Sequence, residues 1–312
     1  MTTWLIAAAA ALLALWPLLG EARRRPVSRR ASQDPAGRHA DLSGGCVYYR
    51  WHGPEAGPVA VCVHGLTTPS YVWDGLIPYL NEQGFRVLSF DLYGRGLSDR
   101  PRGVQDAEFF DAMLRALLDD QGVSGPVTLF GNSMGAAIAT EFAARHPARI
   151  RQLVLLVPAG MGHDLGVGVR LTGGLPLLGD WLFHLVFPYS LRRGARAEAD
   201  LPTSVPDIVS RQLDELRWRG FLRSVLSSVR AMLGRNCHDA HLALHGLDLP
   251  TLAVWGGGDE VIPIACRDRL SQWNPAAEHI VLPDAGHGLV YTHTAALWQR
   301  LGPALIRPDD LM

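Results

Sequence analysis

Short apolar runs alternate with helix-forming stretches along most of the chain, and these runs predict the strands of one sheet. They occupy residues 47–51, 59–63, 86–90, 126–130, 152–157, 250–255 and 280–282. Near-continuous runs of Val, Leu and Ile are typical of strands that are buried on both faces. Alternation of such strands with helices implies right-handed crossover connections. The pattern therefore predicts an α/β fold with a mainly parallel sheet and helices on both faces.

One connection in this pattern is much longer than the others. About ninety residues separate the runs at 152–157 and 250–255, whereas a strand-to-helix connection usually needs only a few loop residues. This connection is rich in Leu, Phe, Trp and Gly over residues 171–189 and has a helical pattern over 205–233. We interpret about 160–247 as an insertion into a domain that extends over 42–312.

The N-terminus follows a different pattern. Residues 4–19 contain no charged side chain, and this length is near the lower limit of about 17 residues that a helix needs to cross a bilayer. The positive-inside rule places the arginine-rich side in the cytoplasm, and the arginines that follow are Arg23, Arg24, Arg25, Arg29 and Arg30. The pattern predicts a single-pass anchor in the inner (cell) membrane over residues 1–22, a flexible tether over 23–41, and a cytoplasmic domain. A signal peptide cleaved near Gly20-Glu21-Ala22, with export of the domain, is the alternative.

The composition supports one large globular domain. The chain has 312 residues, of which 48% are hydrophobic and 19% charged, so it can bury a large core and does not resemble a disordered segment. The formal net charge is −1 and no basic block lies beyond the N-terminal region, which argues against a nucleic-acid partner. No Cys-x-x-Cys spacing occurs, and we interpret the four cysteines as small apolar side chains: Cys46, Cys62, Cys237 and Cys266.

The pentapeptide Gly131-Asn132-Ser133-Met134-Gly135 lies between a predicted strand and a predicted helix over 133–145. Glycines two residues before and after the serine allow a very sharp turn, because side chains there would collide with the neighbouring strand and helix. Such a turn presents Ser133 Oγ to solvent at a helix N-terminus, where the Met134 N–H is free to bind an oxyanion. A glycine-rich turn without a chemical role is the alternative for the pentapeptide alone.

Further motifs follow other predicted strands. His64-Gly65-Leu66 ends the run at 59–63, Asp259 follows Gly256-Gly257-Gly258, and His287 lies in a loop after the last run. A turn over 91–99 has the form Asp-x-x-Gly-x-Gly-x-Ser, and we attribute its glycines to backbone conformation. Together with the pentapeptide, these motifs resemble the α/β-hydrolase superfamily over residues 42–305, with the N-terminal segment outside the resemblance.

The resemblance implies a Ser-His-Asp catalytic triad and an α/β-hydrolase fold with a cap insertion. Ser133 would be the nucleophile, His287 its general base, and Asp259 the carboxylate that orients the imidazole. The N–H groups of Leu66 and Met134 would form the oxyanion hole. Glu260 is the alternative acid, and we expect His64 to stabilise its turn. No metal or organic cofactor is required by this chemistry.

The resemblance also bears on the substrate. In this family, insertions at this position form a cap over the active site, and an apolar cap suits an acyl chain. A purely structural lid is the alternative. We therefore expect a serine carboxylester hydrolase, similar to monoacylglycerol lipases, that cleaves small lipid-like esters such as monoacylglycerols or lysolipids. A carbon-carbon bond hydrolase of the meta-cleavage-product group is an alternative, because that group shares the Gly-Asn-Ser-Met-Gly form of the pentapeptide. However, that group commonly has a tryptophan soon after the catalytic histidine, whereas in this chain residues 288–291 are Gly-Leu-Val-Tyr. A ligand-binding receptor on a hydrolase fold is another.

Three histidines at helical spacing form a possible metal-binding pattern: His238, His241 and His245. Their spacings place them along one helical face. A structural zinc site usually has four ligands, so we interpret these residues as surface or core histidines and expect no metal site here.

Overall fold

The computed structural model describes residues 2–27, 35–162, 164, 166–175 and 177–306. Within these residues, eight strands form one sheet in the order β1-β2-β4-β3-β5-β6-β7-β8. Pairing of β1 with β2 and of β2 with β4 is antiparallel, and all other pairs are parallel. The strands are β1 (Arg38–Leu42), β2 (Gly45–His52), β3 (Val59–Val63), β4 (Arg86–Phe90), β5 (Val127–Asn132), β6 (Ile150–Leu156), β7 (Thr251–Gly256) and β8 (Glu278–Leu282). The predicted mainly parallel sheet is confirmed.

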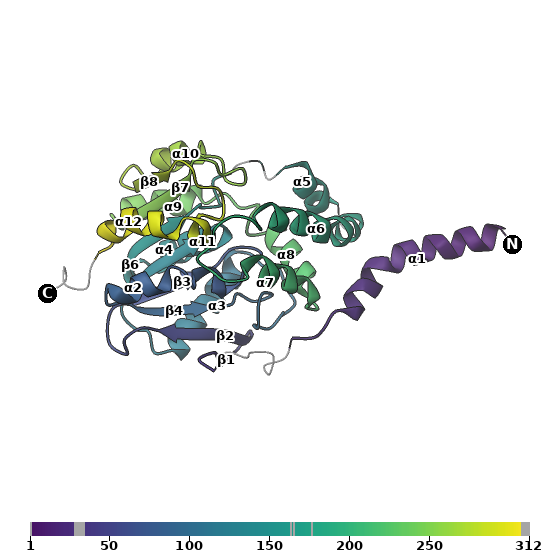
Figure 1. The fold of residues 1–312 in the computed structure, drawn as a ribbon, viewed down its shortest axis with the longest axis horizontal. Helices are drawn as coiled ribbons and strands as arrows, with labels where there is room; N and C mark the ends of the chain where they lie inside the picture. Colours follow the sequence, from purple (N-terminus) through teal and green to yellow (C-terminus); the bar gives the residue numbers. More distant parts are fainter. Residues whose placement is uncertain (1, 28–34, 163, 165, 176, 307–312) are drawn as a thin grey trace.

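Helices cover both faces of this sheet (Figure 1). One face carries α3 (Ala107–Asp120), α4 (Met134–Arg145), α9 (His238–Gly246) and α10 (Cys266–Trp273). The other face carries η2 (Ser70–Trp73), α2 (Ile77–Glu82), α11 (Leu289–Thr292) and α12 (Thr294–Leu301). The short 3₁₀ turns η3 (Pro147–Arg149) and η5 (Gly302–Ala304) follow α4 and α12. All six residues of the central β5 are buried, so the strand that precedes Ser133 is enclosed by both helical layers.

The period of apolar residues explains how α3 packs on the sheet. Phe110, Leu114 and Leu117 recur at spacings of four and three residues and are all buried in the core of that face. Burial of each such side chain contributes roughly 1.5–3 kcal/mol relative to exposure. The helix begins at an N-cap, Asp106, whose carboxylate accepts the Phe109 N–H at 2.9 Å and satisfies one of the free donors of the first turn.

The long connection between β6 and β7 forms a helical cap beside the sheet (Figure 1). It contains α5 (Val167–Gly174), α6 (Leu178–Ala197), α7 (Ile208–Asp214), η4 (Glu215–Arg217) and α8 (Phe221–Arg230). The cap has its own apolar cluster, centred on Phe183, Phe221 and Val225. By contrast, α9 packs against α4 and buries Leu244 in the main core. The sequence pattern had placed this helix inside the insertion, which was predicted to end at about residue 247.

The prediction of a membrane anchor over residues 1–22 is wrong. Within the described residues no helix is long and apolar enough to cross a membrane, and the predicted single-pass inner-membrane location with a cytoplasmic domain is therefore not supported. The uncharged run lies in α1 (Thr2–Arg23), which contains Pro17 and ends in charged residues. The helix bonds to the cap: near its end Glu21 accepts the Gly220 N–H, and near its middle the Leu13 carbonyl accepts the Trp181 indole N–H at 2.9 Å.

The ordered domain begins earlier than the sequence pattern indicated. Residues 38–42, of which most fell in the predicted tether, form β1 and pair in antiparallel register with β2, with Ala40 opposite Val47. Only Ala40 of this strand is buried, which is typical of a short edge strand and explains why no apolar run revealed it. Residues 28–34 of the predicted tether lie outside the described part of the chain.

Candidate active site

Ser133 lies at the sharp turn between β5 and α4. Its φ is 54° and its ψ is −118°, a combination that costs of order 1–3 kcal/mol for a residue with a side chain. Neighbouring backbone groups hold the turn: the Ser133 N–H donates to the Leu156 carbonyl at 2.9 Å, and the Ser133 carbonyl accepts the Ala136 N–H at 2.9 Å. The strained serine is thus tied to the adjacent strand and to the first turn of its helix.

Both glycines of the pentapeptide are required by close backbone contacts. A Cβ atom on Gly131 would lie 2.5 Å from Ala136 Cα. A Cβ atom on Gly135 would collide with the Val63 carbonyl oxygen and lie 2.5 Å from that of His64. These separations are far below van der Waals contact. Glycine therefore allows the serine turn to pack directly against the end of β3.

Asp259, His287 and Ser133 form a continuous line of hydrogen bonds. His287 Nδ1 lies 2.9 Å from Asp259 Oδ2, and His287 Nε2 lies 3.0 Å from Ser133 Oγ. The other carboxylate oxygen of Asp259 accepts the N–H groups of Val261 and Ile262 at 2.8 and 2.9 Å. A carboxylate beside Nδ1 places the ring proton there, which leaves Nε2 free to accept the serine hydroxyl proton. The three predicted residues are brought together in hydrogen-bonding geometry.

The loops that carry the acid and the histidine pack tightly against each other. The N–H groups of Gly257 and Gly258 donate to the carbonyls of Leu282 and Ala285 at 2.8 and 3.0 Å. A Cβ atom on Gly256 would lie 2.5 Å from the Ala285 carbonyl oxygen. This contact brings the ends of β7 and β8 together and places Asp259, which is buried, next to His287. The alternative acid, Glu260, is exposed.

Leu66 and Met134 flank the serine from two different elements. Leu66 lines the cavity beside Ser133, and a Cβ atom on the preceding Gly65 would lie 3.4 Å from Ser133 Cβ. Met134 is the first residue of α4, a position whose N–H has no acceptor within a helix. The backbone that carries both predicted oxyanion donors is therefore next to the serine.

His64 holds the loop that leads to Leu66. Its Nε2 atom accepts the Leu92 N–H at 2.8 Å, so the ring proton is on Nδ1, which lies 2.8 Å from the Gly65 carbonyl oxygen and donates to it. Complete burial lowers the pKa of His64 to about 4, so the ring is neutral at physiological pH. The imidazole therefore joins two adjacent loops.

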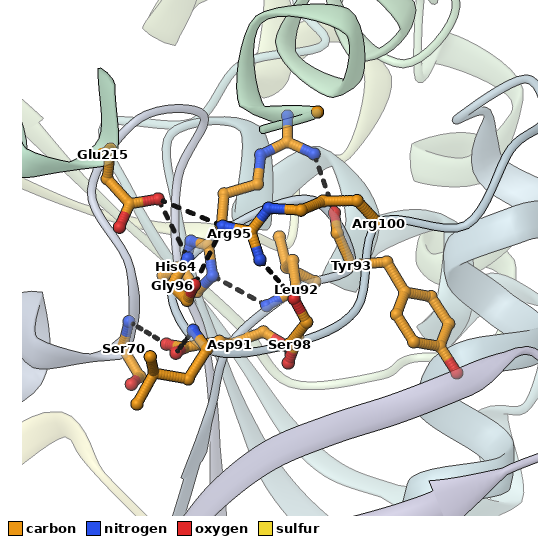
Figure 2. Close-up of polar contacts among 12 residues, drawn as sticks. His64, Ser70, Asp91, Leu92, Tyr93, Arg95, Gly96, Ser98, Arg100 and Glu215 are labelled. Carbon is orange, nitrogen blue, oxygen red and sulfur yellow. Dashed lines mark hydrogen bonds and ion pairs between the residues drawn. The ribbon is translucent and has the colours of Figure 1, made fainter. Parts of the chain in front are cut away.

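Figure 2 shows a buried polar network next to this loop, and sequence reasoning missed its central residue, Arg95. The Arg95 Nε–H donates to the Leu66 carbonyl at 3.0 Å, and its Nη2 donates to Ser228 Oγ on α8 at 2.8 Å. A lone arginine in a turn resembles a solvated residue, so only its place between Gly94 and Gly96 signalled a close approach of backbone. Arg95 thus connects the Leu66 loop to the cap.

Glu215 of η4 connects the same turn to the cap by a second route (Figure 2). Its carboxylate accepts the Gly96 N–H at 2.9 Å and lies 4.0 Å from the Arg100 guanidinium group. Burial removes water from this carboxyl group, and mainly for this reason the pKa of Glu215 is raised to about 7. Asp91 closes the base of the turn by accepting the N–H groups of Ser70 and Leu97, both at 2.9 Å.

A cavity of about 360 Å³ opens at Ser133 and His287, between the sheet and the cap. Most of its walls are apolar, including Leu66, Phe187 and Leu233. A cavity of this size and character suits a small organic molecule. The site can therefore hold an apolar substituent beside the serine.

The helical histidines lie away from this cavity. His241 is fully buried and stacks on Trp273, with ring centroids 6.1 Å apart, and burial lowers its pKa to about 3. Across the described part of the chain, no group of three or more His, Cys, Asp or Glu side chains is arranged to hold a metal ion. His241 acts as a core residue.

The class of protein follows from the fold and from a family comparison. The model of the alpha/beta hydrolase fold family matches residues 58–294, a span that contains the serine turn, the acid turn and the histidine loop. The chain belongs to this family, and it is a hydrolase of the α/β fold. The predicted superfamily membership and fold class are confirmed.

Individual relatives have several activities. The 2-hydroxy-6-oxo-2,4-heptadienoate hydrolase of Pseudomonas putida strain F1 is 32% identical over 260 residues, which cover 79% of this chain and 88% of the relative. Lipase 1 of Psychrobacter immobilis is 25% identical, with coverage of 78% and 76%. The dihydrolipoyllysine-residue acetyltransferase component of the acetoin cleaving system of Pseudomonas putida is 29% identical over 82% of this chain, which spans only 65% of that protein.

A solved structure gives the same fold. The esterase of Exiguobacterium antarcticum superposes with a TM-score of 0.71 at 19% identity, covering 86% of this chain and 98% of the esterase chain. At this identity the similarity concerns the fold alone, and the activity has to be argued from the site.

Proposed function

We propose that the protein hydrolyses carboxylic esters through an acyl-enzyme on Ser133. The observation that carries the proposal is the line of hydrogen bonds from Asp259 through His287 to Ser133, with distances of 2.9 and 3.0 Å. A serine hydroxyl is a poor nucleophile at neutral pH unless an adjacent base takes its proton. In this proposal His287 is that base, and Asp259 keeps the imidazole in the required tautomer.

The proposed reaction has two halves. Ser133 Oγ attacks the ester carbonyl carbon and its proton passes to His287 Nε2, while the carbonyl oxygen becomes an oxyanion beside the N–H groups of Leu66 and Met134. Each such donor contributes about 3 kcal/mol to transition-state stabilisation. His287 then gives its proton to the departing alkoxide. In the second half a water molecule repeats the attack on the acyl-enzyme, releases the acid and restores the serine.

The cavity supports a substrate with one apolar chain. Its walls are mainly apolar and its volume of about 360 Å³ is near the lower end for small-molecule sites. We therefore propose single-chain esters, such as monoacylglycerols or lysolipids of short to medium chain length, rather than esters with several long chains. The relative named Lipase 1 supports an ester substrate of the lipid type.

The test combines covalent labelling with turnover. The purified protein is treated with a fluorophosphonate and assayed against p-nitrophenyl esters of increasing acyl length, in parallel with Ser133→Ala and with Ser210→Ala, which removes an exposed serine on α7. We expect Ser133→Ala to lose both labelling and turnover while Ser210→Ala retains both. Turnover near the parent level in Ser133→Ala would refute the serine mechanism, and labelling without turnover of any ester would favour a ligand-binding receptor.

Carbon-carbon bond hydrolysis is the second candidate. It is favoured by the 32% identity to the 2-hydroxy-6-oxo-2,4-heptadienoate hydrolase and by that group's Gly-Asn-Ser-Met-Gly form of the serine turn. Direct comparison of kcat/KM for that dienoate and for a p-nitrophenyl ester separates the two candidates. A dienoate value at least as large as the best ester value would replace the ester proposal.

A further inference from the structure

The wall of the cavity at Ser133 includes a negatively charged side chain. Among its described lining residues there is one carboxylate, Glu198, and there is no lysine or arginine. The other titratable groups among these described residues are Tyr291 and His287. An anionic substituent would therefore lose its hydration without meeting a cation, whereas a cationic substituent would meet a carboxylate.

Glu198 is held in place by a hydrogen bond to Tyr291. Glu198 is the C-cap residue of α6, partly buried, and its Oε2 atom accepts the Tyr291 hydroxyl proton at 2.6 Å. Burial, together with the Glu198 charge, raises the pKa of Tyr291 well above its usual value, so the hydroxyl remains a donor. Tyr291 lies four residues after His287, which links the cap carboxylate to the loop that carries the proposed base.

We propose that Glu198 is a specificity-determining residue that makes the enzyme select esters with a neutral or cationic substituent over esters with a distal carboxylate. This inference rests on the proposed ester hydrolysis at Ser133. It extends that proposal, because apolar walls alone would reject both signs of charge. A carboxylate in a partly enclosed cavity stabilises a nearby cation and repels an anion, and salt weakens both effects.

The expected size of the effect is modest because Glu198 is partly exposed. Exposed charge pairs are worth up to about a fivefold change in an equilibrium or rate ratio, and the partial enclosure of Glu198 favours the upper end of that range. We therefore expect kcat/KM for a cationic ester, divided by that for its neutral isostere, to fall about fivefold when the carboxylate is removed. The kcat/KM for an anionic ester, divided by that for the neutral isostere, should rise by a similar factor.

The experiment uses two matched series of esters. The first contains butyrylcholine, its carbon isostere with a tert-butyl group in place of the trimethylammonium group, and the butyrate ester of β-hydroxypropionate. The second carries the same three kinds of group at the far end of the acyl chain of a p-nitrophenyl ester. Two series are needed because the charged group can approach Glu198 from the alcohol side or from the acyl side.

Three variants separate charge from structure. Glu198→Gln removes the charge but keeps an oxygen that can accept the Tyr291 proton. Tyr291→Phe removes that hydrogen bond but keeps the charge. Asp200→Asn removes an exposed negative charge two residues away that does not line the cavity. We expect the cation-to-neutral ratio to fall about fivefold in Glu198→Gln in at least one series, and to change by less than twofold in Asp200→Asn.

The outcomes are distinguishable. If Glu198→Gln changes the ratios by less than twofold in both series, or if Asp200→Asn changes them equally, the inference is wrong while ester hydrolysis stands. If the full-length parent protein hydrolyses none of the neutral esters, the proposed function itself fails. Should Glu198→Gln fold poorly, the salt dependence of the parent gives a second test, because a charge preference that is unchanged between low and high salt also overturns the inference.

Discussion

Replacement of Arg95 by methionine tests how far the buried network supports the Leu66 loop. The guanidinium group donates to the carbonyls of Leu66 and Tyr93, both at 3.0 Å, and to Gln105 Oε1 and Ser228 Oγ. Ser228 also donates to Gln105 at 2.7 Å, so those two partners can satisfy each other without Arg95. The two backbone carbonyls cannot, and each buried unpaired acceptor costs about 1–3 kcal/mol.

Before any compensation, the expected loss of stability for Arg95→Met is therefore about 2–6 kcal/mol. Part of it is offset, because burial lowers the pKa of Arg95 to about 9 and methionine removes the desolvation cost that this shift reflects. The loss is still a large share of the roughly 5–15 kcal/mol that stabilises a typical domain. Urea unfolding followed by circular dichroism measures it, with Ser228→Ala as the matched control at about 1 kcal/mol.

Kinetics distinguish a positioning role of Arg95 from a purely structural one. The carbonyl that Arg95 holds belongs to Leu66, whose N–H is a proposed oxyanion donor, and complete loss of such a donor costs about 10²–10³ in kcat. A displaced donor should cost less, so we expect kcat of the folded variant to fall about tenfold with little change in KM. If Arg95→Met lowers the free energy of unfolding by less than about 0.5 kcal/mol, or if the folded variant has an unchanged kcat, then Arg95 does not support the Leu66 loop as argued.

Two further predictions concern the candidate site and its surroundings. His287→Ala should lower kcat almost as much as Ser133→Ala, and the double variant should lose little more, because the residues act as one unit; rate losses that add in the logarithm would contradict this. Glu215 has a pKa raised from 4.5 to about 7 in the folded state, so its contribution to stability is complete below pH 4.5 and is lost as the pH rises through 7. Urea unfolding should therefore show that the parent's free energy of unfolding falls by roughly 3 kcal/mol relative to that of Glu215→Gln between pH 4.5 and a pH above 7. If the difference in unfolding free energy between the two proteins does not vary with pH, the interpretation of Glu215 as a buried carboxyl group is wrong.

The fold was predictable where burial leaves a strong local pattern. The apolar runs at 59–63 and 86–90 coincide with β3 and β4, because strands covered on both faces need apolar side chains at nearly every position. The edge strand β1 has the sequence Arg-His-Ala-Asp-Leu and buries one residue, so no apolar run marked it. The apolar run at the N-terminus led to a wrong prediction, because hydrophobicity alone does not distinguish a membrane span from a helix whose end bonds to the cap.

What the sequence by itself determined is the set of local turns and their order along the chain. Gly131 and Gly135 are readable in advance because no other residue fits beside the ends of β3 and α4, and the same holds for Gly256 and Gly257 before Asp259. The sequence therefore named Ser133, Asp259 and His287 as candidates.

Tertiary structure alone decided the relations between segments that are distant in the chain. It places His287 Nε2 3.0 Å from Ser133 Oγ across 154 positions, buries Arg95 against α8, and sets Glu198 of the cap into the cavity wall. These relations arise because helices and strands pack as rigid layers, and the packing of a layer depends on the whole core rather than on any local pattern. The charge of the cavity and the support of the Leu66 loop belong to this second kind of information.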